Sequence, residues 1–153
     1  MQTRLKVYAY ITSEDRLLVF RHTRFPEAGI QVPGGTVKAG EPPELAVLRE
    51  AQEETGLSDL HIVSYLASQE VDARPWGKDE LHVRHFFHLE PGPRTFPNGA
   101  VPECWIHYEY EPSDGSPGPI EFEFFWVKRD RKPPHRFIVE LVGDLGRMLG
   151  KLD

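Results

Sequence analysis

The sequence predicts a single mixed α/β domain, and three observations support that prediction. First, the chain has 153 residues, which is the usual size of one domain and enough to bury a core. Second, its composition, 39% hydrophobic and 27% charged, is typical of a globular protein. Third, strand-like runs surround a helical stretch, and no segment has the composition of a linker. We therefore expect one domain over residues 1–153.

The first part of the chain predicts a strand hairpin and then a helix. The runs LKVYAYIT (residues 5–12) and RLLVFRH (16–22) are strand-like and are separated by the polar turn SEDR. The segment FPEAGIQVPGG (25–35) is rich in turn residues. Prolines suit the first turn of a helix and glycine suits its end, so we expect a helix from about Pro43 to about Thr55, closed by Gly56.

The rest of the chain predicts four more strands and a terminal helix. The strand-like runs are rich in aromatic and β-branched residues: HIVSYLASQEV (61–71), ELHVRHFFHLE (80–90), ECWIHYEYE (103–111) and IEFEFFWVKR (120–129). Loops rich in proline and glycine separate the last three runs. In the final stretch the apolar residues recur at helical spacing: Phe137, Ile138, Leu141, Leu145 and Met148.

Charge and cysteine content exclude several classes of protein. The net charge of −6 argues against an extended nucleic-acid surface, although a bound divalent cation would still admit a polyanionic substrate. Cys104 is the only cysteine, so an intrachain disulfide is impossible, and we interpret it as a buried, inert thiol. Charges interrupt every apolar run near the N-terminus, which predicts no membrane span and a cytoplasmic protein.

The predicted central helix crowds three glutamates, Glu50, Glu53 and Glu54, into little more than one turn. Like charges at helical spacing repel each other, so stability alone does not explain the crowding. Three carboxylates at this spacing can ligate a hard cation such as Mg²⁺, which prefers oxygen ligands. Taken alone, the glutamates also fit a solvated acidic helix face.

A helical wheel indicates how such a cluster is presented. At about 100° per residue, Leu45, Leu48 and Ala51 lie on one side, and the three glutamates lie roughly opposite. We therefore expect the apolar side to pack on the sheet and the carboxylates to face away from it.

The surroundings of the glutamates strengthen the metal interpretation. The spacing resembles the complete Nudix box, G-x5-E-x7-R-E-U-x-E-E-x-G-U with U apolar, and covers residues 35–57. Seven fixed identities would arise by chance in such a chain at odds below roughly one in a million. Every position of the box is met: Gly35, Glu41, Arg49, Glu50, Ala51, Glu53, Glu54, Gly56 and Leu57.

The resemblance to the Nudix hydrolase family implies a fold and an activity. The implied fold is an α/β/α sandwich with a mixed sheet. The implied enzyme cleaves the diphosphate of a nucleoside diphosphate linked to another group, with Mg²⁺ or Mn²⁺ assisting the attack of water. A small nucleotide, a nucleoside triphosphate first, is the expected substrate. A nucleotide sensor without catalysis and a hydrolase of a non-nucleotide diphosphate are the alternatives, and a homodimer is possible.

The resemblance also implies roles for individual residues. Glu50, Glu53 and Glu54 correspond to metal ligands, together with the backbone carbonyl of Gly35. Either Glu50 or Glu53 serves as the general base, and Arg49 orients a catalytic carboxylate. Glu41, just before the helix, suits the positive end of the helix dipole, so we expect it to be structural.

Two sets of residues outside the box complete the hypothesis. Members of the family often add a further carboxylate, for which we favour Glu121 or Glu123, on one face of the last strand-like run. A solvated strand face is the alternative for both, and Glu103 and Glu109 are weaker candidates. For the substrate, aromatic side chains that could stack on a base are weak candidates: Trp76, Trp105 and Tyr108.

Overall fold

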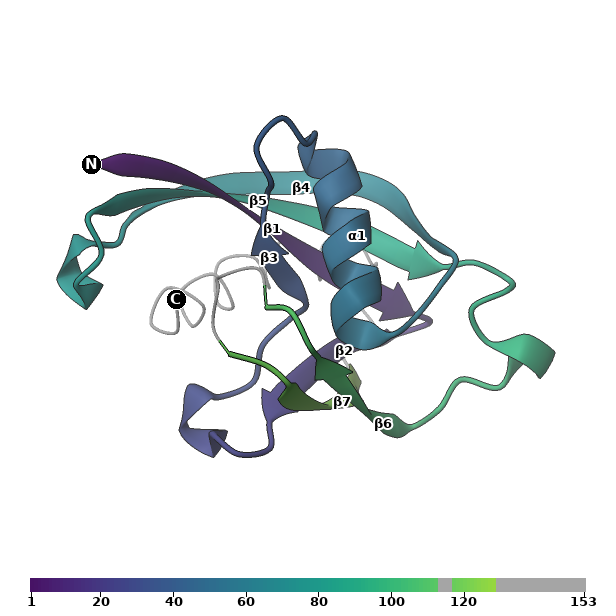
Figure 1. Ribbon diagram of the computed structural model, residues 1–153. Coiled ribbons are helices and arrows are strands. Elements are labelled where there is room, and N and C mark those ends of the chain that lie inside the picture. Colours follow the sequence, from purple (N-terminus) through teal and green to yellow (C-terminus); the bar gives the residue numbers. More distant parts are fainter. Residues whose placement is uncertain (113–116, 129–153) are drawn as a thin grey trace.

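The structure is a computed structural model that describes residues 1–112 and 117–128 (Figure 1). In this part of the chain the elements are β1 (Gln2–Ser13), β2 (Arg16–His22), η1 (Pro26–Ala28), β3 (Gly34–Thr36), α1 (Pro43–Thr55), β4 (Leu60–Asp72), η2 (Arg74–Trp76), β5 (Glu80–Pro91), η3 (Pro97–Gly99), β6 (Cys104–Glu109) and β7 (Ile120–Lys128). The predicted strands and central helix are confirmed. The short strand β3 falls in and just after the segment predicted as a turn, and the predicted terminal helix lies outside the described residues.

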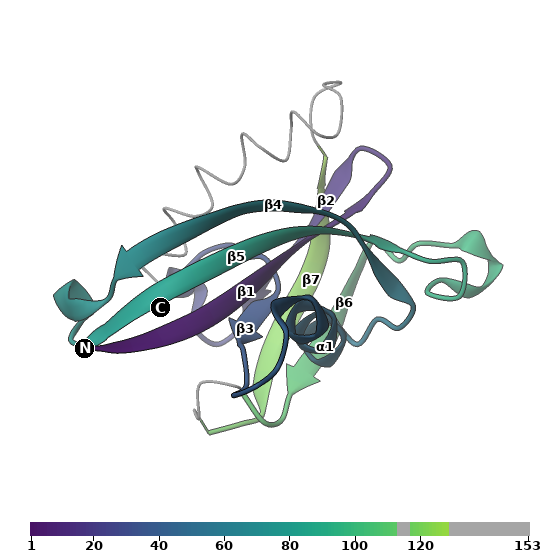
Figure 2. The same ribbon diagram turned by 90° about the horizontal axis from the view of Figure 1, so that it is seen from above.

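The strands form one mixed sheet in the order β4–β5–β1–β2–β7–β6, with β3 paired to β1. The β1–β5 pairing is parallel and the other pairings are antiparallel. Strand β1 meets β2 only near their shared turn, through Thr12–Leu17 and Ser13–Arg16. The sheet therefore diverges into two halves, and α1 packs beside β1, β3, β4 and β6 (Figure 2). This confirms the expected mixed sheet with a helix packed against it.

Side chains of β1 alternate between the two faces of the sheet, and both faces are buried there. Val7, Ala9 and Ile11 join the core cluster that includes residues of α1. Tyr8 and Tyr10 point the other way and join a second cluster. Successive side chains of a strand alternate between faces, so an almost uninterrupted apolar run indicates a strand covered on both sides.

The buried face of α1 differs from the predicted one. Ala46, Val47 and Ala51 pack against the sheet, but Glu50 and Glu54 are buried with them. Leu45, which we expected on the packed side, is 60% exposed. The helix is therefore turned so that two of its carboxylates face the sheet, where backbone and side-chain groups can hold them.

Cys104 also corrects the sequence interpretation, because it is exposed. It begins β6, the last strand in the sheet order, and β6 has its other edge open among the described residues. None of the helices in the described part of the chain has the length and apolar character that crossing a membrane requires.

Candidate active site

Two glycines let the backbone of β3 approach α1 and β1 closely. Gly34 and Gly35 pair with Tyr8 and Val7 of β1. A Cβ atom on Gly34 would lie 2.5 Å from both a ring carbon of Tyr8 and the carbonyl oxygen of Val7. A Cβ atom on Gly35 would overlap the carboxylate of Glu50. Glycine is therefore required at both positions by the lack of space.

Arg49 donates hydrogen bonds to three carboxylates of the candidate site. Its Nε and Nη2 atoms lie 2.7 and 2.8 Å from the two oxygens of Glu41, a bidentate pair. Its Nη1 atom donates to Glu50 at 2.8 Å and to Glu53 at 3.2 Å. The hydrogen bond from Arg49 lowers the pKa of Glu41 to about 2. Glu41 is thus the partner that anchors Arg49, a more specific structural role than the predicted interaction with the helix dipole.

Glu50 and Glu54 are carboxylates almost completely withdrawn from water. Glu50 is 0% exposed and Glu54 is 5% exposed. The backbone N–H of Gly34 donates to Glu54 at 3.1 Å. Burial raises the pKa of Glu54 well above its ordinary value, and the nearby charge of Glu109 raises it further. The charged form of Glu54 is therefore disfavoured unless a positive partner lies beside it.

Strand β6 brings Glu109 to this cluster. The side chains of Trp105, His107 and Glu109 alternate onto the face of β6 that meets α1. The Trp105 Nε1 atom donates to the carbonyl oxygen of Thr55 at 2.9 Å, and His107 Nδ1 lies 2.9 Å from the carbonyl oxygen of Glu54. These contacts fix β6 against the end of the helix and leave Glu109 beside Glu54.

Glu121 and Glu123 share one face of β7, as predicted, but it is the face away from the cluster. Thr23 and Tyr108 donate to the two oxygens of Glu121 at 2.6 and 2.9 Å. Glu123 forms an ion pair with Arg21 at 3.1 Å. The structure therefore joins Glu50, Glu53 and Glu54 with Glu109, one of the weaker sequence candidates. Glu103 is exposed and lies 3.8 Å from Arg16.

The three aromatic candidates lie in different surroundings. Trp105 stacks on Phe124, with ring centroids 5.5 Å apart, and is partly buried against the core. Trp76 lies in η2, at the end of the β4–β5 hairpin remote from α1 (Figure 1). Tyr108 is exposed, and Tyr110 lies beside it with a centroid distance of 6.2 Å. Of the three, Tyr108 is the one at the site.

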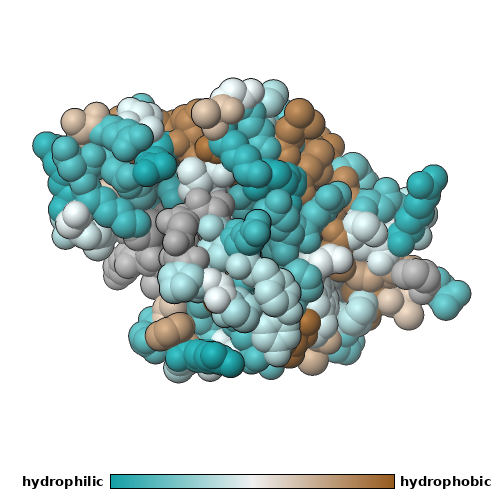
Figure 3. Space-filling view, in the orientation of Figure 1, coloured by the Kyte–Doolittle hydropathy of each residue, from teal (hydrophilic) through white to brown (hydrophobic). Residues whose placement is uncertain are grey.

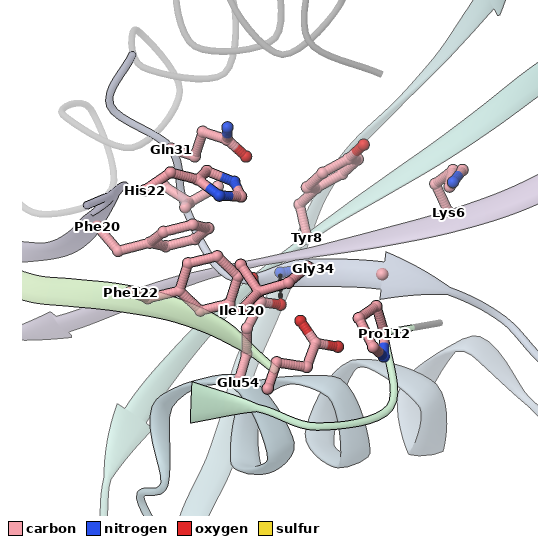
Figure 4. Close-up of a pocket in the computed structure, with 13 residues that line it drawn as sticks. Lys6, Tyr8, Phe20, His22, Gln31, Gly34, Glu54, Pro112, Ile120 and Phe122 are labelled. Atoms are coloured by element: carbon pink, nitrogen blue, oxygen red, sulfur yellow. Dashed lines mark hydrogen bonds between the residues drawn. The ribbon is translucent and has the colours of Figure 1, made fainter. Parts of the chain in front are cut away.

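Two cavities adjoin the carboxylates. A cavity of about 130 Å³ reaches from Lys6 past Glu54 to His22 and Gln31 (Figure 4). An open cavity of about 600 Å³ is lined by residues that include Arg49, Glu53 and Tyr108. Glu109 lines both cavities. The face of the molecule that carries α1 is mainly hydrophilic, with apolar patches beside the helix (Figure 3).

Sequence reasoning missed Lys6, His22 and Gln31. They come from β1, the end of β2 and the segment before β3. No motif links them, so only the pairing of the strands shows that they share a cavity.

The donor set fits a hard divalent cation. It consists of carboxylate oxygens that lie close to the backbone of Gly34 and Gly35. Two of these carboxylates, Glu50 and Glu54, are withdrawn from water. Among residues 1–112 and 117–128, no three His, Cys, Asp or Glu side chains converge on a single point that could hold a metal. Mg²⁺ is commonly held through one or two carboxylates and retains several waters, so it does not require such convergence. The carboxylates that could supply one or two of its ligands are Glu50, Glu53, Glu54 and Glu109, beside the backbone at Gly35.

Comparisons with known proteins agree with this geometry. The chain matches the family model described as NUDIX domain over residues 2–122. No protein in the curated set matches it in sequence.

Solved structures that share the fold include the following three. A UDP-X diphosphatase aligns with a TM-score of 0.58 and 17% identity, covering 100% of this chain and 66% of that one. A MutT NUDIX hydrolase from Burkholderia pseudomallei aligns with a TM-score of 0.50 and 22% identity, covering 93% and 99%. The E. coli ORF135 protein aligns with a TM-score of 0.56 and 17% identity, covering 99% and 90%.

Proposed function

The chain belongs to the Nudix family, and from this premise we propose that it is a metal-dependent pyrophosphohydrolase of a nucleotide-linked diphosphate. Nucleoside triphosphates and other small nucleotides rank first as substrates. One observation carries the proposal: two buried carboxylates, Glu50 and Glu54, face the close-packed backbone of Gly34 and Gly35, beside the smaller cavity that Glu54 lines.

The burial of these carboxylates supports a cation site. A charge removed from water costs free energy unless an opposite charge compensates for it. Arg49 compensates Glu50 directly, whereas the pKa of Glu54 is raised by burial and by the charges of Glu109, Glu50 and Glu53. When bound, Mg²⁺ or Mn²⁺ supplies charge neutralisation of the diphosphate and activation of water.

The surroundings of the glutamates distinguish their roles. Glu50 is fully buried and bound to Arg49, so we assign it to holding the metal. The side chain of Glu53 is 46% exposed and lines the larger cavity, where water can reach it. Arg49 Nη1 lies 3.2 Å from Glu53 Oε2 and orients it. We therefore assign Glu53 as the general base, with Arg49 as a positioning residue.

The homodimer and the cytoplasmic location remain predictions.

A hydrolysis screen tests the proposal. Nucleoside triphosphates, nucleotide sugars, dinucleoside polyphosphates and an isopentenyl-type diphosphate are incubated with the protein and Mg²⁺ or Mn²⁺, and released phosphate is measured. Glu53→Gln keeps the shape of the side chain, so we expect it to fold and to lose activity by orders of magnitude, as loss of a general base implies. Glu44→Gln makes the same change on an exposed residue of the same helix and should retain activity.

The alternatives have distinct outcomes. A protein that binds nucleotides but releases no phosphate with either metal is a sensor. Release from the isopentenyl-type compound alone identifies a non-nucleotide hydrolase.

A further inference from the structure

The smaller cavity has an end that the proposed diphosphate chemistry does not use. Glu54 and Gly34 lie near its middle, with Lys6 toward one end and His22 and Gln31 toward the other (Figure 4). The cavity volume of about 130 Å³ far exceeds the roughly 10–15 Å³ that one ordered water needs. The cavity therefore has room for a chemical group beyond Glu54.

The strand register brings the residues at this end together. Phe20 and Gln31 form an isolated antiparallel bridge, with two backbone hydrogen bonds of 2.9 Å, so their side chains lie on the same side. His22 is two residues beyond Phe20 and is paired with Phe122 of β7. Alternation along a strand then places all four side chains on one face.

Aromatic rings packed on one another line this end of the cavity. The rings of Phe20 and Phe122 lie 4.6 Å apart between centroids. The His22 ring meets Phe122 edge-on, with centroids 4.9 Å apart at an interplanar angle of 83°. Tyr8 completes the lining next to Gly34. Such walls favour a flat, apolar-faced ligand over a hydrated sugar.

Polar groups lie at the far end of the aromatic walls. The amide of Gln31 offers both a donor and an acceptor. His22 Nδ1 is buried and has no hydrogen-bond partner among the residues that the structure describes. Buried polar atoms in proteins are nearly always satisfied, so this ring nitrogen is available to form a hydrogen bond with a ligand in the cavity. A ligand with hydrogen-bonding groups along its edge fits here better than an aliphatic chain.

We propose that this end of the cavity binds a nucleobase that packs against the wall formed by Phe20 and Phe122 and whose edge is recognised by His22 and Gln31. The inference rests on the proposed function, because it assumes that the diphosphate of the same substrate lies at Glu54. Lys6, near the opposite end, then faces the phosphate chain. Tyr108 and Tyr110 line the larger cavity and offer a rival stacking surface, although Tyr108 donates to Glu121 on the outer face of β6.

Binding of products tests this without hydrolysis. The four nucleoside monophosphates and ribose 5-phosphate are titrated into the full chain with Mg²⁺ by calorimetry. Ribose 5-phosphate carries the same sugar and phosphate but no base. We expect at least one monophosphate to bind about tenfold more tightly than ribose 5-phosphate, within the range that stacking of one base contributes.

Two conservative variants test whether His22 and Gln31, at the polar end of the smaller cavity, recognise the base. His22→Phe keeps a ring against Phe122, and Gln31→Met keeps the length of the side chain. Each should reduce the preference for the base by about fivefold or more, the lower end of what one good hydrogen-bonded pair contributes. His61→Phe makes the same change at an exposed position on β4 and should leave the preference intact.

Two results would overturn the inference. One is that no monophosphate binds more tightly than ribose 5-phosphate. The other is that the preference survives both His22→Phe and Gln31→Met but is lost in Tyr108→Ala, which would place the base on the tyrosine pair. A protein that prefers a base but hydrolyses nothing would refute the proposed function and keep this inference. Hydrolysis without any base preference would do the reverse.

Discussion

Glu109 and Glu121 lie near each other at the adjoining ends of β6 and β7 but face opposite sides of the sheet. Glu109 lies beside Glu54, and Glu121 is held by Thr23 and Tyr108. The sequence favours Glu121 as the extra carboxylate, and the geometry reverses that order. Glu109→Gln should lower turnover at least about tenfold, the low end for a ligand or general base. Glu121→Gln should keep near wild-type turnover.

Steady-state kinetics on the two variants decides between the residues. Both substitutions remove one charge and keep the side-chain shape, so thermal melts serve to confirm that both proteins fold. If turnover falls in Glu121→Gln and not in Glu109→Gln, the outer face of β7 takes part in catalysis, and the sequence-based preference was right.

Glu54 should give the metal-free protein a stability that falls as the pH rises. Its pKa in the folded state is raised above the ordinary value of 4.5, so the folded state binds more protons than the unfolded state. The destabilisation is absent below about pH 4.5 and grows as the pH rises through the folded pKa. Glu41 has its pKa lowered to about 2, so its stabilising effect is lost only in more acidic solution.

Urea unfolding of the metal-free protein at about pH 5.5 and about pH 8 tests this linkage. Glu54→Gln should be less dependent on pH than wild type over this range, because its amide does not ionise. Comparing the two proteins cancels the histidines that titrate in the same range. Equal pH dependence in both would show that Glu54 has an ordinary pKa in the fold.

The sequence identifies Gly35 and the candidate residues on α1, ranks Glu109 only as a weaker candidate, and gives no sign of His22 or Gln31. Arg49 and the three glutamates follow a spacing that is dense and local. Glu109 has no such pattern around it. The only sequence signal is that Glu109 lies four residues after Trp105, so alternation along the strand places both side chains on the same face of β6. His22 and Gln31 become neighbours through the bridge between Phe20 and Gln31, a contact that a single sequence does not show.

The limits of α1 were predictable from the sequence, and its orientation was not. Proline and glycine act locally, so Pro43 and Gly56 mark the ends of the helix from the sequence alone. The buried face depends on distant partners. Arg49 and the N–H of Gly34 hold carboxylates that a helical wheel assigns to solvent, and Leu45 is left exposed as a result.

Gly56 and Gly40 make a matched test of how α1 is joined to β6. Both have positive φ, 77° and 76°, so alanine introduces similar backbone strain at each. A Cβ atom at Gly40 meets nothing within 4 Å, whereas at Gly56 it would lie 2.5 Å from the ring of His107. Gly40→Ala should cost about 1 kcal/mol of unfolding free energy, and Gly56→Ala should cost at least about 1 kcal/mol more.

Chemical denaturation measures both costs. Because His107 precedes Glu109 by two residues on β6, Gly56→Ala should also reduce turnover, while Gly40→Ala should not. Equal destabilisation by the two variants would mean that the ring of His107 moves aside without cost and that this contact does not fix β6.

The strands were predictable from the sequence, but their pairing was not. The parallel pairing of β1 with β5 joins segments more than 70 residues apart, such as Val7 and His85. Strand β3 is three residues long and contains two glycines, so it carries no strand pattern. Yet β3 supplies the backbone of the site, and β6 supplies Glu109. The site therefore depends on the tertiary fold, although its recognisable motif is local.

This arrangement predicts that a divalent cation stabilises the whole fold. The carboxylates come from α1 and β6 beside the backbone of β3, so a bound ion would connect elements from both halves of the sheet. A ligand that binds only the folded state adds about 2.7 kcal/mol at a hundred times its dissociation constant. For a protein of this size, that corresponds to a rise of about 5–10 °C in melting temperature.

Thermal melts with increasing MgCl₂ or MnCl₂ measure the effect, and NaCl at matched ionic strength controls for screening. Glu53→Gln and Glu54→Gln should reduce the rise, since each removes a negative donor, and Glu44→Gln on the same helix should not. A wild-type melting temperature that does not respond to either divalent salt would exclude the cation from the proposed function. The buried charge on α1 would then serve the structure through Arg49 alone, and the hydrolysis screen should show no dependence on metal.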